Sequence, residues 1–167
     1  MKFVKGTKEW NMFGELFKLL KKWTTKKELS KSEKFSLYMD CVEFGETYKD
    51  PSEKIILSHT MAYDLLNCIL EEKPVFTFEP DTEEKKMYTA FYFLCQTYWE
   101  PYVAPKNASE EEKMLEDTFW DDCVREFGEF MSHYFMNGDD ATCTIHHRWA
   151  SSFLMYIDNK SISKKKK

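Results

Sequence analysis

Apolar side chains recur every three or four residues along most of the chain, which is the spacing of helices that bury one face. Trp10, Phe13, Phe17 and Leu20 show this spacing in the first such segment. Six segments with this period follow one another between short breaks. The predicted helices cover residues 7–23, 30–48, 50–72, 82–99, 109–136 and 140–157.

Helix-start signals support several of these boundaries. Ser30 and Ser109 are each followed three residues later by a glutamate, which is the pattern of a capping box. Asp50 precedes Pro51, and proline is favoured at the first helical position, so we expect the third helix to begin there. Residues 75–78 alternate weakly and could be a short extended segment, but the sequence offers it no partner strand.

The fold class follows from these helices and from the rarity of turn residues. The chain has 167 residues with only five glycines and five prolines, which argues against a sandwich or barrel with many turns. We expect an all-α protein, a compact five- or six-helix bundle, in which residues 1–158 form a single domain and helix 82–99 is the most buried. A chain of this length needs no metal or disulfide to stabilise its core.

A weak internal similarity raises an alternative within this fold class. The segment 40–46 resembles the segment 122–129 with one residue inserted, and similar residues also recur between the first and fourth helices. The bundle would then consist of two degenerate three-helix units. The simpler explanation is that buried helices draw on the same few residue types.

Charge is unevenly distributed along the chain. Residues 1–34 contain ten lysines and four glutamates, residues 35–158 contain nine cations against 25 acids, and residues 159–167 contain five lysines. A basic head and a basic tail therefore flank a strongly acidic body. We expect the tail, residues 159–167, to be disordered, because it has little apolar surface to bury.

The acids concentrate in the fifth predicted helix, where residues 109–129 contain nine of them. Carboxylates spread over a rigid helical surface can resemble a phosphate backbone, and complementary charge speeds association with a basic partner. Leu115 and Val124 belong to the apolar stripe that we expect this helix to bury. The predicted partner-binding residues are Glu110, Glu111, Glu112, Glu116, Asp117, Asp121 and Asp122.

Paired glutamates suggest an alternative function, a metal-dependent nucleotide or phosphoester hydrolase. Glu43 and Glu46 have E-x-x-E spacing, as do Glu126 and Glu129, and two facing pairs could hold a divalent cation. This spacing resembles the paired motifs of helical nucleotide pyrophosphatases. The further E-x-x-D that such a site needs is missing downstream of either pair.

The lysine-rich head and tail suggest a third possibility, a nucleic-acid-binding subunit. Arg125 and Arg148 are the only arginines, and arginine is the residue that most often reads guanine edges. Specific DNA reading is therefore not expected.

Other patterns limit the chemistry and the compartment. The five cysteines, at positions 41, 68, 95, 123 and 143, include no C-x-x-C pair, so we expect reduced, mostly buried thiols. No phosphate-binding loop, nucleophile elbow or H-E-x-x-H motif occurs, and we expect no cofactor. The most apolar run, residues 87–99, is shorter than a membrane span, and no secretory signal is recognised, so we expect a cytoplasmic protein.

Together these features predict a non-enzymatic protein that acts by binding another macromolecule. We expect a regulator or inhibitor whose acidic helical face docks on a basic nucleic-acid-handling protein, of the kind found in phages and mobile elements.

Overall fold

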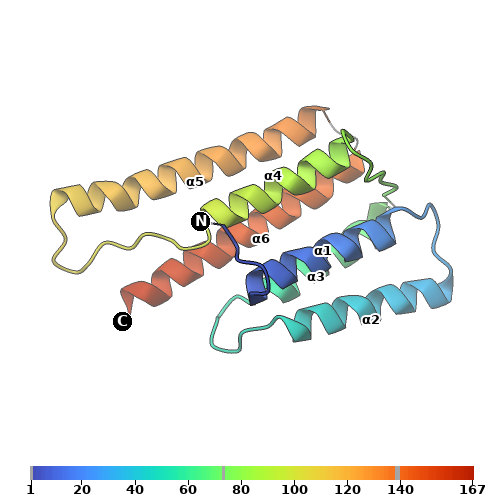
Figure 1. Ribbon diagram of the computed structural model, residues 1–167, viewed down its shortest axis with the longest axis horizontal. Coiled ribbons are helices and arrows are strands. Elements are labelled where there is room, and N and C mark those ends of the chain that lie inside the picture. Colours follow the sequence, from blue (N-terminus) through green and yellow to red (C-terminus); the bar gives the residue numbers. More distant parts are fainter. Residues whose placement is uncertain (1, 73, 138–139) are drawn as a thin grey trace.

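The computed structural model describes residues 2–72, 74–137 and 140–167, and Figure 1 shows them as a bundle of helices. This confirms the all-α fold class, with six helices. They are α1 (Lys8–Thr24), α2 (Lys31–Thr47), α3 (Leu57–Glu72), α4 (Glu83–Thr97), α5 (Glu110–Asn137) and α6 (Asp140–Lys165). Within their described residues, none has a stretch long and apolar enough to cross a membrane.

Local capping explains where several helices begin. The Ser30 hydroxyl accepts the N–H of Glu33, and the Glu33 carboxylate accepts the N–H of Ser30, which completes the predicted capping box of α2. Ser109 and Glu112 exchange the same pair of bonds at the start of α5. Each exchange satisfies backbone donors that the first turn of a helix leaves unpaired.

The prediction for the start of α3 was wrong. The Asp50 carboxylate accepts both the N–H and the hydroxyl of Ser52, two residues along the chain, and so forms a turn instead of a helix cap. Such local side-chain bonds compete with helix formation. The helix begins only at Leu57, the first buried residue of this region.

The helices pack as two groups of three. α1, α2 and α3 contact one another, α4, α5 and α6 do the same, and the packing of α3 against α6 joins the groups. Aromatic rings add a second junction, because Phe13 and Phe17 of α1 contact Phe91 and Tyr88 of α4. This arrangement agrees with the alternative of two three-helix units.

The central helices are α3 and α6, each packed against three others, and not α4 as the sequence predicted. α6 packs against α3, α4 and α5. Its Trp149 is fully buried, lies against Phe91, and donates its indole N–H to the carbonyl of Met61 on α3 at 3.0 Å. α4 is apolar on nearly every side, yet Phe93 remains 63% exposed, because the bundle covers only one side of this helix.

A glycine of α2 lies against a side chain of α3 where these two helices approach each other. A Cβ atom on Gly45 would lie 2.7 Å from Cδ2 of His59, which is closer than real Cβ contacts. The carbonyl of Gly45 also accepts the hydroxyl of the buried Ser58 at 2.8 Å. A side chain at position 45 would therefore force the His59 ring to move.

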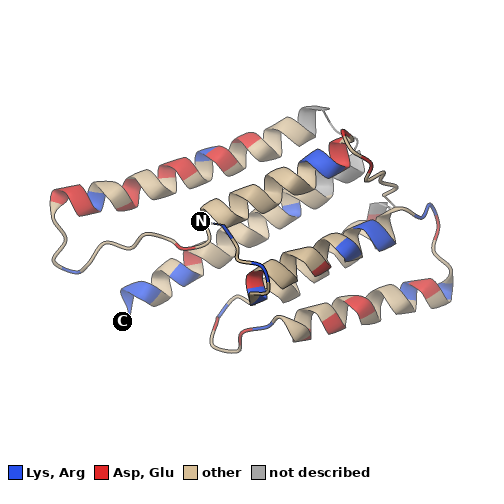
Figure 2. Ribbon diagram, viewed as in Figure 1, with Lys and Arg blue, Asp and Glu red and all other residues tan. Residues whose placement is uncertain are grey.

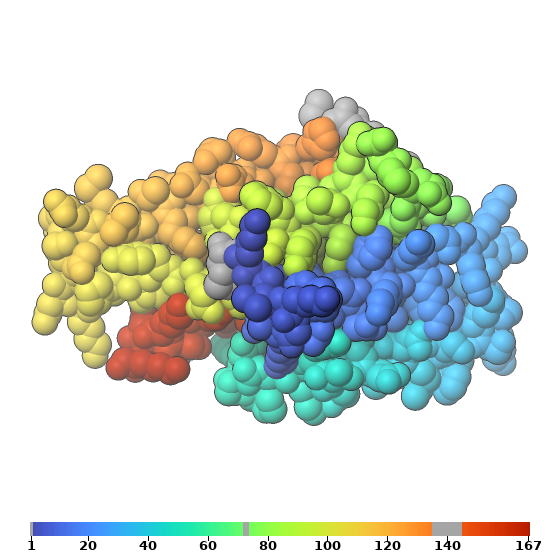
Figure 3. Space-filling model, in the orientation of Figure 1, coloured from blue at the N-terminus to red at the C-terminus, as the bar shows by residue number. Residues whose placement is uncertain are grey.

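The C-terminus differs from the predicted disordered tail. α6 continues to Lys165, and Figure 3 shows the end of the chain (red) beside the loop before α5 (yellow). Lys160 and Lys164 pair with Glu100 at 2.9 and 3.0 Å, and Lys165 pairs with Glu116 at 2.6 Å. These ion pairs, together with the buried Ser161, hold the segment against the bundle.

A matched pair of substitutions on α4 tests which side of this helix is buried. Phe91→Ala removes a fully buried ring and should lower the free energy of unfolding by about 3–5 kcal/mol. Phe93→Ala, two residues away, should change it by less than about 0.5 kcal/mol. Urea denaturation measures both, and similar effects from the two variants would mean that α4 is wrongly oriented.

Asp64 gives the α3–α6 junction a dependence on pH. Burial raises the pKa of this half-buried carboxyl to about 6, although the Ser152 hydroxyl and Arg148 favour the carboxylate. The unfolded pKa is about 3.9. Between these values the folded chain binds more protons than the unfolded chain, so the free energy of unfolding falls as the pH rises.

Asp64→Asn should remove this dependence, because the amide keeps an oxygen acceptor for Ser152 and has no charge to desolvate. At pH 7 the variant should be more stable than the wild type by on the order of 1 kcal/mol, after allowing for solvent screening. At a pH of about 4 the two should be equal. Urea denaturation at both pH values checks this, and a variant that is less stable than the wild type at pH 7 would contradict it.

Candidate functional site

The acidic residues of α5 occupy its solvent side. The helix buries Cys123, Phe127, Phe130 and Tyr134 against α4 and α6, so residues on the opposite side face water. Figure 2 shows a series of acidic positions along α5. We define the acidic face as Glu110, Glu111, Asp117, Asp121, Asp122 and Glu129.

Two predicted partner-binding residues do not belong to this face. Glu112 accepts the backbone N–H of Ser109 and so caps the helix. Glu116 is only 15% exposed, pairs with Lys165, and accepts the backbone N–H of Ala104 at 3.0 Å. These bonds hold the pKa of Glu116 below its usual range. Both carboxylates thus serve the fold.

Cations of the same helix partly neutralise the acidic face. Lys113 pairs with Glu110 at 3.0 Å, and Arg125 pairs with Asp122 at 2.9 Å and with Glu129 at 3.5 Å. Such exposed pairs are weak and open readily.

Three carboxylates remain outside these pairs. Within the described chain, Glu111, Asp117 and Asp121 have no cation at ion-pair distance. They are therefore the acids most available to an external partner.

Exposed apolar side chains lie among these acids. Met114, Leu115 and Val124 are 65%, 56% and 57% exposed, although the sequence pattern assigned Leu115 and Val124 to the buried stripe. Figure 1 shows that the start of α5 extends beyond α4, so α4 does not cover this part of the helix. The side of α5 that faces solvent is therefore both acidic and apolar.

The structure does not bring the two E-x-x-E pairs together. Glu43 and Glu46 lie on α2, whereas Glu126 and Glu129 lie on α5, and Figure 1 places these helices on opposite sides of the bundle. No group of three or more potential metal ligands occurs among the described residues. The two pairs therefore cannot form the shared metal site that the sequence suggested.

Glu126 instead belongs to the α4–α5 contact. It accepts the hydroxyl of Tyr98 just after α4. Burial, followed by this bond to a carboxylate, raises the pKa of the Tyr98 hydroxyl above its usual range. On α2, Glu46 pairs with Lys49 and with His59, so it too has local partners.

Many lysines of the predicted nucleic-acid surfaces are paired within the chain. At the head, Lys22 pairs with Asp40 and Lys26 with Glu33, both at 2.8 Å. At the tail, Lys164 and Lys165 are held by the carboxylates described above. This pairing reduces the positive charge available to a phosphate backbone.

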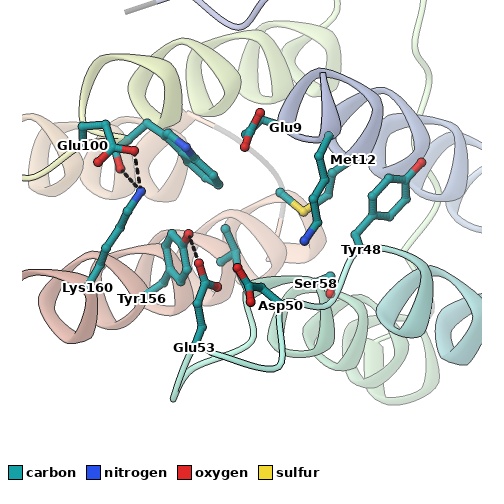
Figure 4. A pocket seen from close by; sticks show the side chains of 12 residues that line it. Glu9, Met12, Tyr48, Asp50, Glu53, Ser58, Glu100, Tyr156 and Lys160 are labelled. Atoms are coloured by element: carbon teal, nitrogen blue, oxygen red, sulfur yellow. Dashed lines mark hydrogen bonds and ion pairs between the residues drawn. The ribbon is translucent and has the colours of Figure 1, made fainter. Parts of the chain in front are cut away.

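A polar cavity that the sequence did not reveal lies where the two groups of helices meet. Its volume is about 140 Å³, and Figure 4 shows residues from both groups around it. Tyr156 donates its hydroxyl to Glu53 at 2.9 Å, and burial raises the pKa of that carboxyl despite this bond. Glu100 is held by Lys160. The Tyr156–Glu53 bond joins the two groups of helices, whereas the Glu100–Lys160 pair lies within the second group, so the polar side chains around the cavity serve helix packing.

The described cysteines and one histidine are core residues. Cys41, Cys68, Cys95 and Cys123 are buried, as predicted, and burial raises the pKa of the Cys41 and Cys123 thiols to about 12. The side chain of Cys143 lies outside the described residues. His146 is fully buried, and its Nε2 lies 2.9 Å from the carbonyl of Met131.

Comparison with protein-family models, with curated proteins and with solved structures finds no match to this chain. The functional argument therefore rests on the geometry of its surfaces.

Two neighbouring acids of α5 separate a structural role from a surface role. Glu116→Gln removes the ion pair with Lys165 and should lower the free energy of unfolding by about 1–2 kcal/mol. Asp117→Asn removes the same charge from the exposed side and should change it by less than about 0.5 kcal/mol. Urea denaturation distinguishes them, and equal effects would show that Glu116 is not held as described.

Proposed function

We propose that this protein is a non-enzymatic regulator or inhibitor that binds a basic nucleic-acid-handling protein through the acidic face of α5. The observation that carries the proposal is the mixture of exposed carboxylates and exposed apolar side chains along one outer helix. A face that served only solubility would need the acids, but not Met114, Leu115 and Val124 beside them.

The two kinds of side chain would serve different steps of binding. Carboxylates attract a basic groove at long range and raise the association rate. Apolar side chains that become buried then slow dissociation, because they leave water only in the complex. The helix itself is held rigidly by α4 and α6, so little conformational entropy is lost when it docks.

Charge reversal on the acidic face should slow association with the partner. Asp117→Lys combined with Asp121→Lys changes two exposed acids one helical turn apart, and should lower the association rate about tenfold. The matched control is Glu28→Lys with Glu79→Lys, two exposed acids away from α5. Both double variants should remain folded by circular dichroism.

The measurement begins with affinity capture from extracts of the source cell, with and without nuclease. We expect the wild type and the control to capture basic proteins, and the α5 variant to capture less of them. Nuclease treatment should leave this capture unchanged. Surface plasmon resonance with the captured protein then gives the association rate, which should fall steeply with salt. Equal capture by the two double variants would contradict the proposal.

A further inference from the structure

A second surface, on the opposite side of the bundle from α5, is apolar. The α2–α3 face consists of Phe35, Tyr38, Met39 and Val42 of α2 with Tyr63, Leu66 and Leu70 of α3. All except the partly buried Leu66 are 41–66% exposed. Contiguous apolar surface of this kind marks an interaction site.

α2 has apolar side chains on two sides, which a helix at the edge of a bundle does not need. Leu37, Cys41 and Phe44 face the core. Phe35 and Val42 lie on the other side, seven residues apart on one helical stripe. A helix that is apolar on both sides is normally covered on both.

The α2–α3 face is also hollowed. A groove of about 230 Å³ runs between the two helices, where Tyr38 and Val42 face Ala62, Tyr63 and Leu66. Gly45 and His59 also line the groove, and the absence of a side chain at position 45 leaves room for the His59 ring. The face therefore offers both protruding rings and a recess to receive them.

The stripe on α2 is complementary to itself in charge. Lys31 lies four residues before Phe35, and Glu46 lies four residues after Val42, so the stripe is basic at one end, apolar in the middle and acidic at the other. Its midpoint falls between Tyr38 and Met39. Lys31 has no carboxylate within ion-pair distance in the described chain, whereas Glu46 has Lys49 and His59 beside it.

We propose that the α2–α3 face binds a second copy of this chain, with the two α2 helices antiparallel about a two-fold axis through the midpoint of the stripe. Phe35 of one copy then packs against Val42 of the other, and Lys31 lies beside Glu46 of the other. A two-fold interface uses the same patch on both subunits, so every contact occurs twice. The proposal does not depend on the function proposed for α5.

The mass of the full-length chain in solution tests this proposal. Sedimentation equilibrium should give twice the mass of one chain, and Phe35→Glu should give the monomer mass. Phe93→Glu, on an equally exposed ring of α4, is the matched control and should leave the dimer intact. A wild type that is monomeric at about 100 μM, a concentration at which even a Kd of about 10 μM gives mostly dimer, would overturn the proposal.

Charge exchange tests the antiparallel arrangement itself. Lys31→Glu alone and Glu46→Lys alone each place like charges together twice in the dimer, and each should raise Kd at least about tenfold. An equimolar mixture of these two variants should dimerise as the wild type does, because both contacts then join opposite charges. The double variant Lys31→Glu/Glu46→Lys should also recover.

The mixture distinguishes weaker dimerisation from lower stability of a single chain. It contains the same two variant chains that dimerise poorly alone, so recovery in the mixture cannot come from a change in their stability. Circular dichroism verifies that each variant is folded. Failure of both the mixture and the double variant to recover would overturn the antiparallel arrangement. A dimer that survives Phe35→Glu would show that the copies associate through another surface.

Discussion

The packing of α3 against α6 is the contact on which the rest of the structure depends. Trp149 fills the centre of this junction and donates to the carbonyl of Met61, while Ser152 donates to Asp64. α2 attaches to the bundle through α1 and α3, and α5 attaches through α4 and α6. The junction therefore holds two outer helices apart, each with one side turned to water.

The parts of the fold that the sequence predicted well are those with local causes. Ser30 and Glu33 are three residues apart, so their mutual capping can be recognised without knowing the tertiary structure. Asp50 shows the limit of this reasoning, because an aspartate before proline can cap a helix or form a turn, and both uses are local. Tertiary packing decides between them, since the first buried residue is Leu57.

Long-range contacts explain what the sequence missed. Periodicity showed that α4 is apolar, but not which of its aromatic rings would face solvent. In the structure that ring is Phe93. In the tail, Lys165 is ordered by Glu116, and nothing in the local sequence joins them. Among the predicted partner-binding acids of α5, the role of Glu112 was predictable from Ser109, whereas that of Glu116 was not. The outer stripe of α2 was hidden because its apolar residues alternate with those of the core.

The placement of the two outer faces has a consequence for binding. Because α2 and α5 lie on opposite sides of the bundle, a dimer formed through α2 directs both acidic faces outward. The electrostatic part of the contact proposed for α5 is weakened at physiological salt, since exposed charges are screened beyond about 8 Å. Two copies of that contact on one rigid particle bind a partner with repeated basic sites more tightly, because the second contact forms at high effective concentration. The α2–α3 face would then strengthen binding by joining two acidic faces in one particle.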